Sequence, residues 1–190
     1  VIVSHPIQYY TPYWRAITAD GRVQIKAFFC SHIGLKPALD PKFGIEIVWK
    51  ADLLGGYDHE FLDGADGITT TKFADVNNPS ISSRLEEYGP DVILVHGYAH
   101  ITLLRAIFWA RRNRVPVMNI SDRSFFGIST WARRAARRLV LPLILRQYSA
   151  FLCLSDAIED FYKSFGARLD QVFRVPLMLD ERYWEASKDK

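Results

Sequence analysis

The sequence predicts an α/β protein, in which a mostly parallel central sheet carries helices on both of its faces. Short apolar runs of strand length alternate along the chain with stretches of helical period, which is the order in which parallel sheets are built. The runs "VILV" at 92–95 and "FLCL" at 151–154 are also continuously apolar, as expected of strands covered on both sides. The fold class therefore follows from the order of the elements and from the composition of the strands.

The expected elements extend through almost the whole chain and together form one Rossmann-like three-layer sandwich. Strands are predicted at 1–4, 23–30, 91–97, 115–121, 150–155 and 171–176, and helices at 12–20, 101–113 and 156–166. A long arginine-rich stretch follows the strand at 115–121.

Local signals support two of the helices. Ile101, Leu104 and Phe108 share one apolar face at the spacing i, i+3, i+7, which predicts an amphipathic helix. In the later helix, Ser155 is placed to cap the first turn and Gly166 to end the last one.

The segment 41–79 has a different character. It is rich in glycine between Gly55 and Gly67, has few apolar repeats and ends in Asn77-Asn78-Pro79. We expect a long excursion of short strands and loops, and long loops in compact domains are often functional.

The composition indicates the compartment. Cys30 and Cys153 lie within apolar runs, which predicts buried thiols in a reducing environment. No apolar run approaches the roughly 20 residues that span a bilayer, and the first residues lack the layout of a signal peptide. We expect a cytoplasmic protein, or one lying peripherally on the inner face of the membrane. Because Val1 already lies in what reads as a core strand, we also expect a piece of a longer protein.

Charge is unevenly distributed, although the formal net charge is only +3. Acidic side chains outnumber basic ones by nine to two between Asp52 and Asp91, whereas the stretch from Arg105 to Arg146 holds ten arginines and one acid, Asp122. This asymmetry predicts a surface that meets anionic material.

Polar side chains follow four of the predicted strands, at the ends where an open parallel sheet binds its ligands. They are His5, Gln8, Tyr9 and Tyr10 after 1–4, His96, Tyr98 and His100 at the end of 91–97, Ser121, Asp122 and Arg123 after 115–121, and Ser155 and Asp156 after 150–155. Such a set of hydrogen-bonding groups suits a polyhydroxylated or phosphorylated ligand.

Several of these residues also have a purely structural interpretation. His5, directly before Pro6, can simply hold a tight turn, and Ser155 can act only as a helix cap. Asp122 can pair with a neighbouring arginine. His96 is the best placed for function, because Gly97 beside it lets the backbone approach a ligand closely.

Common motifs of nucleotide and hydrolase chemistry are missing from the sequence. It contains no G-x-G-x-x-G after the first strand, no Walker lysine motif and no G-x-S-x-G elbow. No Cys/His cluster has zinc spacing, and no Asp-x-Asp pair is present to hold a divalent ion on a diphosphate.

Four blocks of the chain resemble the N-terminal domain of bacterial glycosyltransferases of the GT-B fold, close to family four. The blocks are "SHPIQYYTPYWRAI", "FGIEIVWKADLLGGYDHEFL", "VILVHGY" and "RVPLMLDERYW", and they occur in the family's order from Val1 to about Trp184.

The resemblance implies an enzyme of two Rossmann-like domains that face each other across a cleft. The N-terminal domain mainly holds a glycan or lipid-linked acceptor, and the C-terminal one binds a nucleotide-sugar, which is a co-substrate rather than a cofactor. Similar enzymes transfer the sugar with retention and need no bound metal. Residues 1–176 would be the N-terminal domain and 177–190 the start of the interdomain linker.

The family's paired glutamates of the donor domain do not occur in this sequence. The resemblance therefore implies an acceptor-side fragment of a hexosyltransferase that is inactive alone. The alternative is a non-catalytic sugar- or nucleotide-binding module.

The resemblance also suggests roles for the strand-end residues. The loop 5–10 would face the cleft, with Gln8, Tyr9 and Tyr10 offering donors and aromatic faces to a sugar. His96 would be the catalytic candidate, orienting the transferred sugar or stabilising charge on the leaving phosphate. The substrate-binding candidates, in full, are His5, Gln8, Tyr9, Tyr10, Tyr98, Asp122 and Arg123.

The arginine-rich stretch has two interpretations. Arg133, Arg134, Arg137 and Arg138 form a basic ridge that could meet an anionic membrane surface, where each basic residue contributes about 1 kcal/mol. Alternatively, the leucines at 139–145 cover the sheet and the arginines are merely solvated. Nucleic acid is disfavoured as a partner, because aromatic residues are not interleaved with the ridge.

Overall fold

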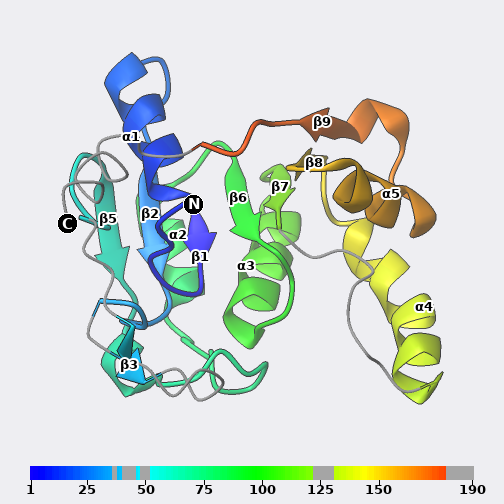
Figure 1. Ribbon diagram of the computed structural model, residues 1–190, viewed down its shortest axis with the longest axis horizontal. Coiled ribbons are helices and arrows are strands. Elements are labelled where there is room, and N and C mark those ends of the chain that lie inside the picture. The colour runs from blue at the N-terminus through cyan, green and yellow to red at the C-terminus, as the bar shows by residue number, and fades with distance from the viewer. Residues whose placement is uncertain (36–37, 40–45, 48–51, 122–130, 179–190) are drawn as a thin grey trace.

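The chain forms a seven-stranded, wholly parallel sheet with helices on both faces, as predicted (Figure 1). The computed structural model describes residues 1–35, 38–39, 46–47, 52–121 and 131–178, with 38–39, 46–47 and 131–137 described by their backbone alone. The strands are β1 (Ile2–Val3), β2 (Lys26–Phe29), β5 (Asp58–Phe61), β6 (Ile93–His96), β7 (Val117–Ile120), β8 (Ala150–Cys153) and β9 (Val172–Arg174), in the spatial order β5-β2-β1-β6-β7-β8-β9.

The strand order reverses direction at β1, and this divides the helices between the faces. The connection from β1 to β2 runs toward one edge of the sheet through α1 (Thr11–Asp20). The connections from β6 onward run toward the other edge through α3 (Ile101–Arg112), α4 (Trp131–Leu145) and α5 (Asp156–Ser164). Because such crossovers are right-handed, α1 covers one face and α3 to α5 cover the opposite one.

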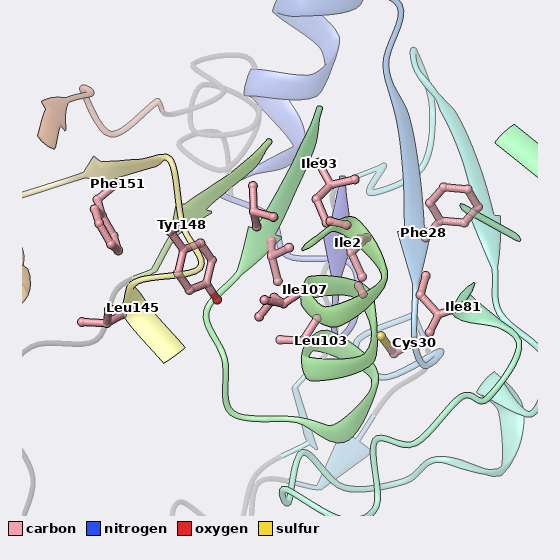
Figure 2. Packing of buried hydrophobic residues seen from close by; sticks show 14 of the residues in the cluster. Ile2, Phe28, Cys30, Ile81, Ile93, Leu103, Ile107, Leu145, Tyr148 and Phe151 are labelled. Carbon is pink, nitrogen blue, oxygen red and sulfur yellow. The ribbon is translucent and has the colours of Figure 1, made fainter. Parts of the chain in front are cut away.

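The core follows this division. The larger cluster of buried side chains lies between the sheet and the helices α2 (Ile81–Tyr88) to α5, and includes Ile2, Ile93, Leu103, Ile107 and Phe151 (Figure 2). A second cluster gathers Val3, Phe29 and Leu94 under Tyr10 and Trp14 at α1. Neighbouring strand residues such as Ile2 and Val3 therefore enter different clusters, which explains why apolar residues follow one another in β1 and β8 instead of alternating with polar ones.

The segment 41–79 contains short strands, as expected, but one of them, β5, joins the edge of the main sheet, and this pairing was not predicted. Helix α2, which follows Pro79, was not predicted either. Another short strand of the segment, β4 (Glu46–Ile47), forms a small antiparallel pair with β3 (Ala38–Leu39), which lies just before it. β5 has the sequence "DHEF", and ion pairs outside the core help to hold it in place. Glu60 accepts from Lys26 Nζ at 3.0 Å and from Arg84 Nε at 2.5 Å.

Two helix faces differ from the sequence-based expectation. In α3 the residues that meet the sheet are Leu103, Ala106, Ile107 and Ala110, whereas Phe108 is 61% exposed. In α4 the leucines divide: Leu141 and Leu145 are buried, while Leu139 and Leu143 are 75% and 58% exposed.

The helix caps are simpler than predicted. Ser155 is the N-cap of α5, but it acts through its carbonyl, which accepts from Ile158 N and Glu159 N, and not through its side chain. Gly166 follows the end of that helix with a φ of +97°. Within the described part of the chain, no helix combines the length and the apolar character needed to cross a membrane.

Candidate functional site

A pocket of about 430 Å³ opens at the carboxyl ends of β1, β6 and β7. It lies beside the point where the strand order reverses, which is the usual ligand site of open α/β sheets. Its lining residues are Ser4, His5, Pro6, Ile7, Gln8, Tyr9, Tyr10, Thr71, His96, Gly97, Ala99, His100, Ile120 and Ser121. The structure thus brings five of the predicted residues, His5, Gln8, Tyr9, Tyr10 and His96, into one pocket.

A larger groove, of about 1110 Å³, lies at the opposite, amino ends of the strands. Its walls include Trp14, Lys26, Tyr88 and Met118. We place the candidate site in the smaller pocket because the imidazoles gather there and because parallel sheets bind ligands at their carboxyl ends.

The loop from His5 to Tyr10 is held in a tight turn that leads directly into α1. The Ile7 carbonyl accepts from Tyr10 N at 3.0 Å and from Thr11 N at 3.2 Å. Pro6 fixes the backbone at the start of the turn, and Pro12 occupies the first turn of the helix, where a missing amide hydrogen costs nothing. The loop therefore presents its side chains from a fixed backbone.

His96 ends β6 in register with Ile120 of β7. Its ring meets Tyr10 edge to face with the centroids 4.2 Å apart, and Trp14 packs against it with a centroid distance of 5.6 Å. Nε2 is buried and has no hydrogen-bond partner in the described structure. Burial lowers the pKa of His96 to about 3, so the imidazole is neutral near pH 7 and offers one donor and one acceptor.

Two further imidazoles line the same pocket. His5 Nδ1 lies 2.9 Å from Ser4 Oγ, and His100 is the N-cap residue of α3. Burial, with a smaller contribution from His100, lowers the pKa of His5 to about 4. Among the described residues, no group of three or more His, Cys, Asp or Glu side chains could hold a metal ion.

The N-terminus of α3 points to the pocket through His100, but its amide groups are already in use. Ile101 N donates to Phe73 O at 3.3 Å, and Thr102 N donates to Val76 O at 3.2 Å. A helix N-terminus can bind phosphate only through amide groups that are free to donate. The start of α3 is therefore a poor phosphate site.

Asn78 fixes this arrangement from inside. Its side chain is fully buried and donates to Cys30 O at 3.0 Å and to Asp63 O at 3.1 Å, and its Oδ1 accepts from Thr102 Oγ1 at 2.9 Å. One amide thus ties the end of β2, the excursion and the first turn of α3 together, and positions Thr71 and His100 from outside the pocket.

The pocket's described lining does not include three of the predicted residues, Tyr98, Asp122 and Arg123. Tyr98 is not among the pocket's lining residues and packs against the larger core cluster instead. The turn at Gly97, whose φ is +77°, interrupts the strand between His96 and Tyr98. Asp122 and Arg123 lie outside the described residues, as do the side chains of Arg133, Arg134 and Arg137.

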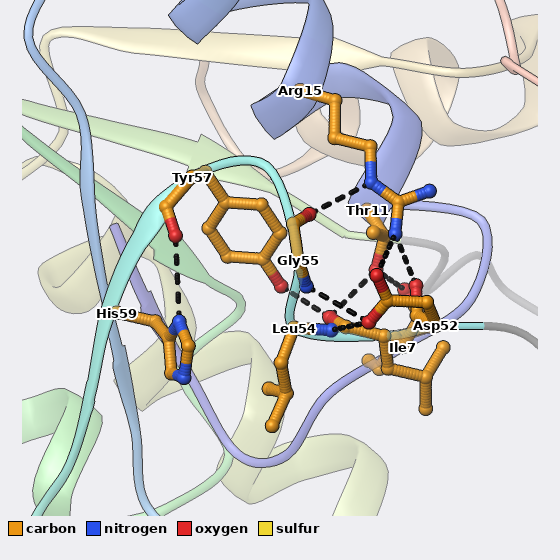
Figure 3. A network of polar contacts seen from close by, with 9 residues as sticks. Ile7, Thr11, Arg15, Asp52, Leu54, Gly55, Tyr57 and His59 are labelled. Carbon is orange, nitrogen blue, oxygen red and sulfur yellow. Dashed lines mark hydrogen bonds and ion pairs between the residues drawn. The ribbon is translucent and has the colours of Figure 1, made fainter.

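A polar network outside the pocket was missed by the sequence analysis, although its residues belong to the block "KADLLGGYD" (Figure 3). Arg15 of α1 donates from Nε to Gly55 O at 2.8 Å and forms an ion pair with Asp52 at 3.4 Å. Asp52 Oδ1 accepts from Leu54 N and Gly55 N at 3.1 and 2.9 Å. The network fastens the excursion to the helix that follows the pocket loop.

Thr11 connects the same network to the pocket loop. Its hydroxyl lies 3.3 Å from both Ile7 O and Leu53 O. Glycine is favoured at Gly56, whose φ is +86°, and a Cβ on Gly55 would displace the Asp52 carboxylate, which lies 2.1 Å from its position.

Comparison with known proteins bears on this site as well as on the fold. A search of curated proteins found no match to the chain. The family model of the glycosyl transferase 4-like domain matches residues 64–177, which is more than half of the chain and includes β6, β7 and the pocket residues His96 to Ser121. The chain therefore belongs to the glycosyl transferase 4-like domain family of glycosyltransferases.

Proposed function

We propose that this chain is the acceptor-side half of a glycosyltransferase that moves a sugar from a nucleotide-sugar to a glycan or lipid-linked acceptor. In this proposal residues 1–176 are the acceptor-side domain, 177–190 begin the link to a donor-binding domain, and transfer proceeds with retention and without a bound metal. Family membership supports the transferase class, and the pocket supports the division of labour between two halves.

The observation that carries the proposal is that the described lining of the pocket contains no carboxylate, lysine or arginine side chain. The lining includes hydroxyls, an amide and imidazoles instead. Both His5 and His96 have pKa values lowered by burial, so they add no positive charge near pH 7. Groups of this kind match the hydroxyls and the apolar face of a sugar ring.

The same pocket is poorly suited to a diphosphate. Phosphate groups are usually bound by arginine, lysine or free helix N-terminal amides. The described pocket contains neither cation, and the first amide groups of α3 donate to Phe73 O and Val76 O. We therefore assign the donor's diphosphate to groups outside this pocket, and we expect the chain alone to transfer no sugar.

Individual roles follow from position. The Nε2 atom of His96 is a buried polar atom of the pocket lining with no hydrogen-bond partner in the described structure, so we assign it a hydrogen bond to the sugar undergoing transfer. Gln8 and Tyr9 are half-buried at the rim and are assigned to acceptor hydroxyls. Tyr10 is only 3% exposed, and we assign it the support of His96 rather than a stacking face for the sugar. Asp122 and Arg123 stay candidates for the acceptor on sequence grounds.

The absence of a carboxylate in the described lining also favours a second candidate, a non-catalytic sugar-binding module. The two functions share the pocket and differ in whether turnover occurs. Joining the chain to a donor domain and measuring sugar transfer separates them, because a binding module would give no product with any partner domain.

Binding is tested by saturation-transfer difference NMR on the 190-residue chain with a panel of methyl glycosides and with uridine and guanosine diphosphates. We expect transfer to at least one glycoside and none to the diphosphates, with the glycoside signal lost in His96→Ala and retained in the control His59→Ala. His59 lies on β5 and is not among the residues that line the pocket. Binding of a diphosphate in place of every glycoside, abolished by His96→Ala, would contradict the proposal.

A further inference from the structure

Four large apolar side chains are exposed on the two helices that cover the same face of the sheet. Phe108 on α3 is 61% exposed, and Leu139, Val140 and Leu143 on α4 are 75%, 52% and 58% exposed. Both helices bury their other faces in the same core cluster, through Leu103 and Ile107 on α3 and through Leu141 and Leu145 on α4. These four residues are therefore exposed and are not part of the core.

The exposed residues of the two helices adjoin one another. Arg111 at the end of α3 donates to the Gln147 side chain, and Gln147 Nε2 donates to Leu143 O at 2.8 Å. Phe108 lies one turn before Arg111, and Leu143 lies one turn before Gln147, so the two apolar side chains lie on neighbouring helix faces. Figure 1 shows α4 at the rim of the molecule, where its outer face has no helix beyond it.

Arginines surround this apolar group. Arg105 and Arg112 are exposed on α3, and Arg138 and Arg146 are exposed at α4. None of the four forms an ion pair with a carboxylate within the described part of the chain, and the hydrogen bond of Arg105 goes to the neutral Asn77 side chain at 3.3 Å. We call these four arginines with Phe108, Leu139, Val140 and Leu143 the α3–α4 surface.

We propose that the α3–α4 surface docks on an anionic lipid bilayer. Leu139, Val140, Leu143 and Phe108 enter the boundary between headgroups and acyl chains, and the arginines contact the lipid phosphates. A surface helix that combines bulky apolar side chains with basic ones binds membranes in this way. The proposal does not rest on the sugar pocket, which is built from other residues.

The observations favour a bilayer over the other anionic partners. Single-stranded nucleic acids are bound through aromatic side chains on which bases stack, and three of the four apolar residues here are aliphatic. An acidic protein would pair with the arginines through charge, and that pairing gives no role to the exposed side chains of Leu139, Val140 and Leu143. A bilayer requires only adjoining apolar and basic groups, which is what the surface supplies.

The arrangement also differs from the basic ridge that the sequence suggested. The ridge consisted of Arg133, Arg134, Arg137 and Arg138, and the leucines were expected to cover the sheet. Exposed leucines on α4, together with two arginines and a phenylalanine from α3, give the surface an apolar component that the ridge lacked.

The test is co-sedimentation of the 190-residue chain with phosphatidylcholine vesicles, with and without about 30% phosphatidylglycerol. We expect binding only to the anionic vesicles, weakened by salt. Arg112→Ser with Arg138→Ser should reduce partitioning about 25-fold, because each basic residue near the surface contributes about fivefold. Leu139→Ser should reduce it about tenfold, from the lost burial of one leucine side chain.

Matched controls distinguish binding through this surface from nonspecific adsorption to the vesicles. Leu169 is 75% exposed, like Leu139, but lies in the turn before β9, so Leu169→Ser should leave binding unchanged. Arg22→Ser removes an exposed arginine beyond α1 and should have a small effect. Circular dichroism of each variant reports folding separately.

Three outcomes would overturn the proposal. One is equal binding to neutral and anionic vesicles, and another is the same loss for Leu139→Ser and Leu169→Ser. The third is binding to a single-stranded oligonucleotide, or to an acidic protein, that is abolished by the arginine variants while vesicles are not bound. None of these outcomes affects the glycoside-binding experiment, so the two proposals fail separately.

Discussion

The rings of His96 and Tyr10 meet edge to face, with their centroids 4.2 Å apart, at the junction of the sheet and the pocket loop. His96 comes from the end of β6, and Tyr10 is the residue before α1, so one contact joins two of the loops that make the pocket. The contact contributes to the burial of the imidazole, and burial is the largest cause of the lowered pKa of His96.

Stability should therefore fall in mild acid. The folded pKa of His96 is about 3, and an unfolded histidine has a pKa of about 6.5. Between these values the unfolded chain binds more protons than the folded chain, so the free energy of unfolding decreases as the pH falls through this window. We expect the protonation of His96 in the unfolded chain to lower the free energy of unfolding by about 2 kcal/mol between pH 7 and pH 5. Urea denaturation at each pH measures this change.

His96→Gln should flatten this pH dependence, while the control His59→Gln keeps it. His5, whose folded pKa is about 4, contributes in the same direction, so the His96 variant retains part of the slope. An unchanged slope in His96→Gln would show that the imidazole is not buried in the neutral form.

The contact between Arg15 and the Asp52–Gly55 turn leads to a prediction about local dynamics. Arg15→Met removes the donor to Gly55 O and the ion pair with Asp52 while keeping most of the side chain's apolar length. We expect a loss of stability of about 1–2 kcal/mol, because a partly buried charged hydrogen bond is lost. Native-state hydrogen exchange should show faster exchange at Leu54 and Gly55, whose amides donate to Asp52.

Arg22→Met serves as the control, because Arg22 is bonded only to Asp20 in the described structure and is largely exposed. If both variants leave exchange at Leu54 and Gly55 unchanged, the turn is held by Thr11 and Tyr57 without help from the guanidinium.

Much of the fold was predictable because the central strands are continuous runs of mostly apolar residues. β6 and β8 illustrate this: buried on both faces, their "ILVH" and "AFLC" segments stand out from the surrounding sequence. The place of β5 in the main sheet was not predicted, because its sequence "DHEF" has one apolar residue, Phe61, and Glu60 forms ion pairs outside the core. Local periodicity carries no information about such long-range pairing.

The site was predictable to the extent that strand ends converge. Parallel strands end at one edge of the sheet, so His5 and His96 could be placed together without a structure. Thr71 could not, because it reaches the pocket from the excursion. Tyr98 follows the turn at Gly97 and packs against the larger core cluster, and it is not among the residues that line the pocket.

Helix α3 offers a direct test of which of its apolar residues pack in the core. Both Ile107 and Phe108 are large and apolar, but Ile107 is 1% exposed and Phe108 is 61% exposed. Ile107→Ala should lower the free energy of unfolding by about 2–5 kcal/mol, because it leaves a cavity in the core. Phe108→Ala should change it by less than about 0.5 kcal/mol. Denaturation of the two variants in parallel measures the loss in the free energy of unfolding for each. Equal losses would contradict the assigned helix face.

Asn78 provides the sharpest contrast, because its neighbour Asn77 is the same residue in a different environment. Asn78 is fully buried and its amide makes three hydrogen bonds to three separate segments, whereas Asn77 is exposed and meets only Arg105. Asn78→Ala leaves the carbonyls of Cys30 and Asp63 and the Thr102 hydroxyl with fewer partners, so we expect a loss of about 3 kcal/mol or more. Asn77→Ala should cost less than about 0.5 kcal/mol.

Asn78 should also determine the position of one wall of the pocket. With the amide gone, the excursion that carries Thr71 loses its side-chain link to the first turn of α3 and keeps the bonds to Phe73 O and Val76 O and from Asn78 N. The chemical shifts of His100 and Thr71 should therefore change in Asn78→Ala, while those of Gln8 stay close to their original values. The reason is that Gln8 belongs to the loop held by Ile7 and Thr11, which Asn78 does not touch. Equal shifts at all three positions would mean that the pocket moves as one rigid unit and that Asn78 stabilises the domain without positioning one wall of the site.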